Sequence, residues 1–392
     1  MLNKTWLWRS VVAVSLTFCA TSVVAQAPDL QLVARNLVQS VRVAPGEKVL
    51  ITGSVRDAAL LEHIAVETMK AGGQPLIALG SEQLARRSYD EVPETYDTIE
   101  PTLDLALVNM MDVQISVDVG EAEAPLAHVP QARLTARAKA FEPVTQAFLR
   151  RGVRLVSLGN SLYPTAAVSQ RLGVAQPALA STFWKAASVP ADALRAKGEA
   201  LRSTITKAKT LTITHPNGTN ISFTVDAGRG FISDGAITPE KVKQGGAAVQ
   251  TWLPAGELIL PAAAGAANGK IVIDKMLWRG KEVRGLTLSY SGGRLTSMTA
   301  ASNVEGLKAA YDGAGGAKDQ FGYVDVGLNP ETTLPLGSGR VVWTVPGSIT
   351  VGLGDNRGFG GTNASDFGLA TQLPGATLAA DGTTVIDSGT LK

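Results

Sequence analysis

Carboxylates in the glycine-rich second half of the sequence are the side chains best suited to chemistry. Five of them stand in glycine-dense segments: Glu257, Asp325, Asp355, Asp366 and Asp381. Carboxylate oxygens are the ligands that hard cations such as Mn²⁺, Mg²⁺ and Ca²⁺ take in proteins. Acids on turns between strands also bond the neighbouring backbone, which is their commoner role. The spacing is compatible with a cation site and with ordinary turns.

Histidine and cysteine, the usual ligands of softer metals, are scarce. The histidines are His63, His128 and His215; no two of them have H-E-x-x-H spacing, and none follows residue 215. Cys19, the only cysteine, lies in an apolar segment near the amino terminus. Zinc peptidases rely on imidazole or thiolate ligands, so the second half lacks the groups for such a site. The glycine runs at 313–316 and 352–354 have no strand–loop–helix context, and we expect no nucleotide cofactor.

The amino terminus has the pattern of a secretory signal peptide. Lys4 and Arg9 precede an uncharged run from Ser10 to Ala25 that ends in small residues. The run is shorter than the roughly 20 residues that span a membrane. We predict a signal peptide over residues 1–25, a mature terminus at Gln26, and export to the periplasm or the medium. We expect no membrane span to remain after cleavage.

The charge balance argues against nucleic acid as a partner. Removing Lys4 and Arg9 leaves 34 basic residues against 34 acidic ones. Nucleic-acid-binding proteins usually carry a basic surplus. The remaining chain is longer than a single core usually spans, which predicts two domains.

Residues 26–208 have the pattern of a three-layer α/β domain with a mainly parallel sheet. Apolar runs typical of strands alternate with helical periodicity, and this alternation predicts βαβ units. The predicted strands are 48–52, 75–79, 114–117 and 153–157, and the predicted helices are 29–41, 57–71, 132–149 and 191–207.

Residues 209–392 have the pattern of a β-rich α+β domain. Two alternating runs at 211–214 and 221–225 flank Asn217-Gly218, a strong hairpin signal. Further strands are predicted at 270–273, 286–290, 341–345 and 349–353, with one helix at 304–311.

Several segments of this half resemble, in order, the aminopeptidase T family of thermophilic metallopeptidases. The matching segments are Gly218–Ile221, Leu253–Glu257, Gly322–Pro330, Gly347–Gly354 and Gly360–Ser365. The first half, from Pro45-Gly46-Glu47 onwards, fits the family more loosely. The resemblance implies a two-domain, dinuclear-metal aminopeptidase, and it is compatible with a homodimer.

The metal ligands that the resemblance implies are mostly substituted. The family uses two glutamates, two histidines and an aspartate, and only the first glutamate has a match, Glu257. The other four ligand positions and the nearby tyrosine fall at Tyr323, Thr350, Gly368, Ala370 and Arg357. A hydrolytic zinc site needs about three protein ligands. Without the metal, nothing lowers the pKa of the attacking water toward neutrality.

We therefore predict an exported, catalytically degenerate relative of these aminopeptidases, without a cofactor. It would bind a peptide or another small ligand in the cleft between its domains, and Glu257 would hold its turn by accepting backbone N–H bonds. The alternative is an active hydrolase in which Glu257, joined by Asp325, Asp355 or Asp366, holds Mn²⁺, Mg²⁺ or Ca²⁺ rather than Zn²⁺. Convergence of three of these carboxyl groups within about 5 Å of one point would favour this alternative.

Overall fold

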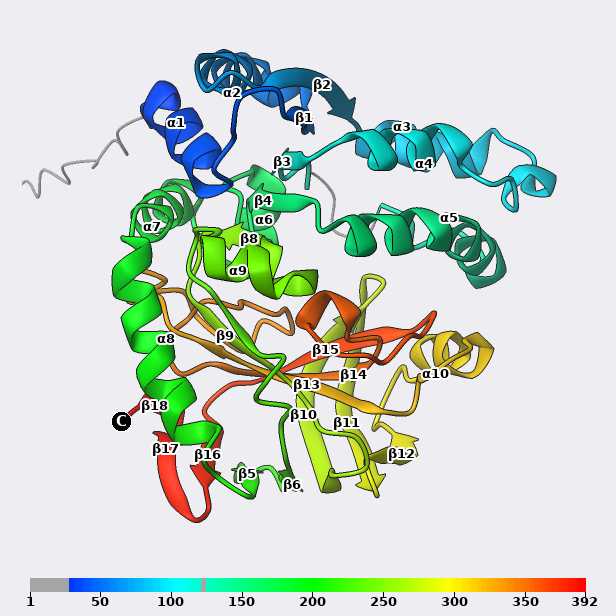
Figure 1. Ribbon diagram of the computed structural model, residues 1–392. Helices are drawn as coiled ribbons and strands as arrows, with labels where there is room; N and C mark the ends of the chain where they lie inside the picture. Colours follow the sequence, from blue (N-terminus) through cyan, green and yellow to red (C-terminus); the bar gives the residue numbers. More distant parts are fainter. Residues whose placement is uncertain (1–27, 121–124) are drawn as a thin grey trace, which may run out of the picture.

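The computed structural model describes residues 28–120 and 125–392. The predicted signal peptide and the cleavage site at Gln26 lie outside these residues. Figure 1 shows an amino-terminal unit, blue to green, above a second unit coloured mainly yellow to red. Helix α8 (Ala191–Ile205) leads from the first unit down one side of the second.

The amino-terminal unit is built on a parallel five-stranded sheet, here sheet A, in the order β2-β1-β3-β4-β8. Its strands are β1 (Lys48–Ser54), β2 (Gln74–Gly80), β3 (Val113–Val117), β4 (Arg154–Leu158) and β8 (Gln250–Leu253). Parallel neighbours need crossover connections, which are usually helices. The predicted α/β class is confirmed.

Helices surround this sheet. They are α1 (Leu30–Ser40), α2 (Ala58–Lys70), α3 (Glu82–Asp90), α4 (Thr102–Met110), α5 (Gln131–Arg151), α6 (Ala166–Leu172) and α7 (Gln176–Ala187). Local signals fix their ends: Asp29 accepts a bond from the Leu32 N–H at 3.0 Å at the start of α1, and Gly152, at φ 62°, ends α5. The inner faces of α1 and α2 bury Leu37 and Ile64 in the apolar core of this unit.

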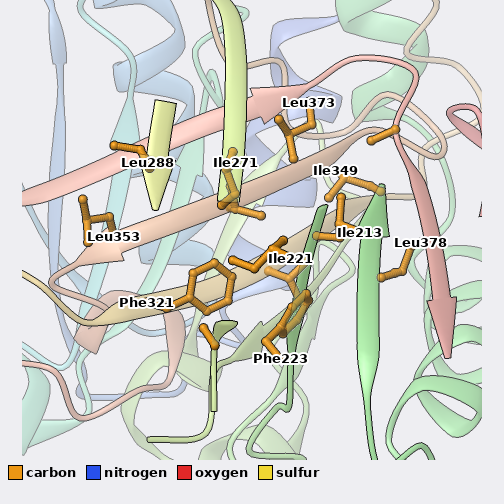
Figure 2. Packing of buried hydrophobic residues seen from close by; sticks show 14 of the residues in the cluster. Ile213, Ile221, Phe223, Ile271, Leu288, Phe321, Ile349, Leu353, Leu373 and Leu378 are labelled. Carbon is orange, nitrogen blue, oxygen red and sulfur yellow. The ribbon is translucent and has the colours of Figure 1, made fainter. Parts of the chain in front are cut away.

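The second unit consists of two antiparallel sheets packed face to face. Sheet B has the order β12-β11-β10-β6-β5-β16-β17-β18, and sheet D has the order β15-β14-β13-β9-β7. Figure 2 shows their shared core, in which Ile271 and Phe223 of sheet B meet Ile349 and Leu373 of sheet D. The predicted β-rich second half is confirmed.

The strands of this unit differ in length, from 2 residues in β18 to 11 in β10 and β11. The strands of sheet B are β5 (Leu211–Thr214), β6 (Asn220–Phe223), β10 (Asn268–Trp278), β11 (Lys281–Ser291), β12 (Arg294–Thr299), β16 (Thr377–Ala380), β17 (Thr383–Asp387) and β18 (Thr390–Leu391). Those of sheet D are β7 (Phe231–Ser233), β9 (Glu257–Pro261), β13 (Phe321–Gly327), β14 (Ile349–Gly354) and β15 (Gly368–Leu373). The helices are α9 (Pro239–Gln244) and α10 (Glu305–Gly313), and 3₁₀ turns lie at Gly246–Val249 and Arg357–Phe359. Two further 3₁₀ turns, Val55–Asp57 and Glu94–Tyr96, belong to the first unit.

The second half of the sequence contributes one strand to the first unit. β8 lies in the second half of the sequence but pairs with β4 of sheet A, from Leu155 beside Gln250 to Leu158 beside Leu253. β9 follows four residues later and belongs to sheet D. The chain therefore passes from one sheet to the other immediately before Glu257. The division at residue 208/209 stays a prediction, and β8 shows that the second segment contributes to the first unit.

The predicted strand at 341–345 is wrong, because this segment is a loop. The amide side chain of Gln372 takes the place of a neighbouring strand: its Nε2 donates to the Val342 carbonyl at 2.7 Å, and its Oε1 accepts from the Val342 N–H at 3.1 Å. Val342 is buried, and the other apolar residues of the loop are half-buried, without ladder pairing. Their composition therefore resembles that of a strand.

Candidate functional site

The two faces of sheet D differ in character, and the strand register determines which residues each face carries. Leu260, Val324 and Val351 are register partners on the face that packs on sheet B. Their neighbours in sequence point the other way, because side chains alternate along a strand. This opposite face, here the cleft face, contains Glu257 on β9, Asp325 on β13 and Thr350 on β14.

A cavity of about 390 Å³, here the acid cavity, separates the cleft face from the carboxyl ends of two strands of sheet A. Asp118 follows β3, and Asn160 and Ser161 follow β4; all three line the cavity together with Glu257 and Asp325. Parallel α/β sheets bind ligands outside the carboxyl ends of their strands, near the point where the strand order reverses. In sheet A that point is between β1 and β3.

Glu257 and Asp325 are buried acids with too few partners. Glu257 is 3% exposed and Asp325 1% exposed. The Asn160 amide donates to Glu257 Oε1 at 3.3 Å, whereas Glu257 Oε2 and both carboxyl oxygens of Asp325 have no hydrogen-bond partner among the residues that the structure describes. The expected role of Glu257 as an acceptor of backbone N–H groups in a turn is therefore wrong: Glu257 begins a strand, and its carboxyl group lines the cavity.

The surroundings favour the protonated forms of both acids. Burial raises the pKa of Glu257 to about 7, although hydrogen bonds from Asn160 and Ser233 oppose the shift. Burial and then the Glu257 carboxylate raise the pKa of Asp325 well above its usual range. Because two adjacent buried carboxyl groups resist carrying two charges, the pair holds at least one proton at neutral pH. It can donate one hydrogen bond and accept several.

An aromatic stack fills the middle of the cleft face. The ring of Tyr323 lies 3.9 Å from that of Phe359 with an angle of 14° between them. It also lies directly over Gly352, where an added Cβ would come within 2.0 Å of the ring. Trp343 packs beside Phe359 at 6.0 Å. Tyr323 stands where the family resemblance places the second glutamate, so an apolar contact replaces a metal ligand there.

The other two predicted acids lie beyond this stack. Asp355 and Asp366 line a second cavity of about 390 Å³, to which Tyr323 and Phe359 also contribute. Asp355 is paired with Arg357 at 2.5 Å, and Asp366 accepts from the Gly315 N–H at 3.2 Å. The structure therefore brings Glu257 together with Asp325 and places Asp355 and Asp366 elsewhere. Among residues 28–120 and 125–392, no three His, Cys, Asp or Glu side chains are grouped to hold a metal ion.

Some residues that line the acid cavity are not among the site residues predicted from the sequence. These are Asp118, Asn160, Trp252, Trp343 and Phe359. Asp118 and Asn160 carried a usable signal, because each follows a strand that the sequence predicts, and the carboxyl ends of parallel strands meet at one edge. The aromatic residues carried none, since Trp252 reaches the cavity from β8, and Trp343 and Phe359 reach it from a loop and a 3₁₀ turn that are distant in sequence.

This fold and site define a class of protein: a parallel α/β unit and a pair of antiparallel sheets, with a polar cavity between them. The sequence profile of the thermophilic metalloprotease (M29) family matches residues 27–324, and the chain belongs to this family. No curated protein matches the sequence.

Solved structures are similar over nearly the whole chain. Wild-type AmpT from Thermus thermophilus has a TM-score of 0.66 and 15% identity, covering 92% of this chain and 98% of that one. The 2,5-dihydroxypyridine dioxygenase from Pseudomonas putida KT2440 has a TM-score of 0.56 and 13% identity, covering 93% of this chain and 96% of that one. At such identities the likeness concerns the fold, and the same fold carries proteins with different names.

The donor set does not fit the dinuclear metal centre that the resemblance implies. Glu257 is present, but a stacked tyrosine, a threonine, a glycine and an alanine stand at the other four ligand positions. None of these four offers a carboxylate or imidazole. The residues therefore do not reproduce the ligand set that the resemblance implies. In the described part of the chain, no helix has the length and apolarity needed to span a membrane.

Proposed function

We propose that this protein is an exported, ligand-binding member of the metalloprotease family that does not use the family's metal chemistry. It holds a peptide or another small molecule in the acid cavity between its two units. Export rests on the signal-peptide pattern of residues 1–25 and on no structural observation.

One observation carries the proposal: Glu257 and Asp325 are buried side by side, and three of their carboxyl oxygens have no partner within residues 28–120 and 125–392. Buried polar groups without partners are costly and rare in native proteins. Oxygens that are buried in the free protein, yet line a cavity, are suited to bind the donors of a ligand. The aromatic stack of Tyr323 on Phe359 supports the proposal that no metal is used, because the ring of Tyr323 stands where the resemblance places a glutamate ligand.

The same unpartnered oxygens favour a second candidate, a metal-dependent hydrolase with a rebuilt site. Glu257 and Asp325 would hold a hard cation such as Mg²⁺, Mn²⁺ or Ca²⁺, with waters completing its coordination. Asp355 and Asp366 do not contribute to such a site, because they lie beyond the aromatic stack. Two carboxylates are fewer protein ligands than hydrolytic metal sites commonly use. We therefore favour the ligand-binding protein over the hydrolase.

The test combines metal content with turnover. Protein purified without chelators is analysed by mass spectrometry for bound metal and assayed on aminoacyl arylamides with Zn²⁺, Mn²⁺, Mg²⁺ or Ca²⁺ added singly. We expect substoichiometric metal, no metal-dependent turnover, and no saturable rise in melting temperature with any of the ions. Glu257→Gln is the control. Stoichiometric metal together with turnover that the control abolishes would overturn the proposal and establish the hydrolase.

A further inference from the structure

We propose that a further cavity, here the amide cavity, binds an uncharged small molecule with an apolar body and an edge that both donates and accepts hydrogen bonds, such as a carboxamide or a lactam. Residues of β1, β3 and β8, of helices α4 and α5, and of the turn at 357–359 line this cavity. The inference goes beyond the proposed function, because none of the described residues lines both the amide cavity and the acid cavity.

The pairing of sheet A places two glutamines on the same face. Gln114 on β3 is the register partner of Leu50 on β1 and of Leu155 on β4. Leu155 is in turn the partner of Gln250 on β8. Register partners on neighbouring strands point to the same side of a sheet, and on this side Leu50 packs in the apolar cluster of α4 and α5. Both glutamine side chains therefore point toward these helices, and both line the amide cavity.

The walls of the amide cavity are mainly apolar. Leu107 of α4 and Phe141, Val144 and Phe148 of α5 are among the side chains that line it. Its volume of about 450 Å³ lies within the range of small-molecule sites, which are typically apolar with a few polar groups that fix the orientation of the ligand. An aromatic or aliphatic body gains free energy when it is buried against such walls.

Gln250 is the residue that points to a polar edge on the ligand. Its side chain lines the cavity and the residue is only 8% exposed, yet no residue within 28–120 and 125–392 forms a hydrogen bond with its amide group. Gln114, which is half-buried, likewise has no side-chain partner in this part of the chain. Buried polar groups in native proteins are nearly always hydrogen-bonded. A ligand that enters this cavity must therefore offer hydrogen bonds to the amides.

The chemistry of an amide selects the kind of edge. A glutamine side chain offers two N–H donors and one carbonyl acceptor. A carboxylate on the ligand would accept from the N–H groups and leave the carbonyl unmatched, and an ammonium group would do the reverse. A carboxamide or lactam has a donor beside an acceptor, so it matches both halves of the amide of Gln250.

The charged residues that line the cavity do not select an ion. Arg357 donates to Asp355 at 2.5 Å and is paired with Glu142 as well. Asp104 is exposed in the first turn of α4, where water solvates its carboxylate. An exposed carboxylate contributes little to the binding of a cation. The experiment nevertheless includes a cationic probe, because Asp104 and Asp355 are both acids.

The experiment compares benzamide with three analogues of similar shape. Toluene has no hydrogen-bonding group, benzoate is an anion that only accepts, and benzamidinium is a cation that only donates. Binding of benzamide to the whole protein near pH 7 is measured by NMR titration, and each analogue is measured by its displacement of bound benzamide, so that binding elsewhere does not count. We expect saturable binding of benzamide and affinities about tenfold or more weaker for each analogue, the scale of a buried amide left unsatisfied.

Matched variants locate the bound benzamide. Gln250→Leu should weaken benzamide about tenfold and bring its affinity close to that of toluene, whereas Gln170→Leu, at an exposed position of α6, should change neither. Because leucine removes a buried amide that has no partner, Gln250→Leu should be at least as stable in urea as the wild type. A glutamine kept only for structure would instead give a less stable variant with an unchanged preference for benzamide. Gln250→Met replaces Gln250→Leu if the latter does not fold.

The outcomes separate this inference from the proposed function. Equal affinity for toluene and benzamide refutes the polar edge, and tighter binding of benzamidinium or benzoate refutes the uncharged class. Failure of benzamide to bind, or an unchanged affinity in the Gln250 variant, refutes the site. None of these results alters the metal content or the turnover, which alone decide between the ligand-binding protein and the hydrolase.

Discussion

The buried acid pair should contribute more to the stability of this protein in acid than at neutral pH, and Glu257→Gln should remove much of that contribution. Glu257 has its pKa raised from its usual 4.5 to about 7 in the folded chain. Between these values the native state keeps a proton that the unfolded state releases. The free energy of unfolding therefore falls as the pH rises through this window, and the contribution of Glu257 is fully present below pH 4.5.

The magnitude follows from the same two values. At 1.36 kcal/mol for each pH unit, the rise corresponds to about 3 kcal/mol of stability lost between pH 4.5 and pH 8. Asp325, whose pKa is also raised, shifts stability in the same direction. Glutamine keeps the size of the side chain but has no proton to lose. We expect Glu257→Gln to be more stable than the wild type at pH 8 and to have a flatter dependence on pH.

Urea unfolding at pH 5, 6, 7 and 8 measures this difference. Asp366→Asn is the matched control, because its carboxyl group is 28% exposed and lies outside the acid cavity, and its curve should follow the wild type. Parallel curves for the wild type and Glu257→Gln, or a wild type that gains stability from pH 5 to pH 8 relative to the variant, would refute the argument that Glu257 is held protonated.

Three further predictions concern packing and processing. Gly352→Ala places a methyl group within 2.0 Å of the Tyr323 ring, so the stacked ring must shift. We expect the free energy of unfolding, measured in urea, to fall by about 1–3 kcal/mol. An unchanged unfolding midpoint would contradict the stacking. Gln372→Ala leaves the N–H and carbonyl of Val342 without their partner. The free energy of unfolding in the same assay should fall by about 2–3 kcal/mol. A fall below 0.5 kcal/mol, which is about the error of additivity, would mean that water replaces the amide. The mature protein should begin at Gln26 without lipid, and an intact mass that includes residues 1–25 would disprove the signal peptide.

The architecture was largely predictable because it depends on local patterns. Apolar runs with helical or alternating period mark β1, β3, α2 and α5 in the sequence, and the order of these elements specifies a parallel sheet. The same logic failed at 341–345, where a buried loop has the composition of a strand. The local pattern there indicates that side chains face the interior, but it does not indicate which backbone groups form hydrogen bonds with each other.

The acid pair was predictable only in part. Glu257 stood out through the family resemblance, and Asp325 was one of several acids among glycines. Their proximity depends on the register of β9 against β13, which places Asp325 opposite Ile259 and hence beside Glu257 on the same face. Two residues 68 positions apart meet only through this antiparallel pairing. The stack of Tyr323 on Phe359 depends likewise on a glycine, Gly352, of the neighbouring strand β14.

The protonation of the acid pair also affects how either candidate ligand binds. A divalent cation prefers ionised carboxylates, so its binding must release the protons that burial holds on Glu257 and Asp325, and its affinity falls as the pH drops below 7. The ammonium group of a bound peptide needs at least one ionised carboxylate and can donate to a neutral one as well, so it releases fewer protons. Calorimetry in buffers of different ionisation enthalpy counts those protons. Because the protein alone must bear the desolvation of both acids, whichever ligand binds there restores stability that the empty cavity lacks.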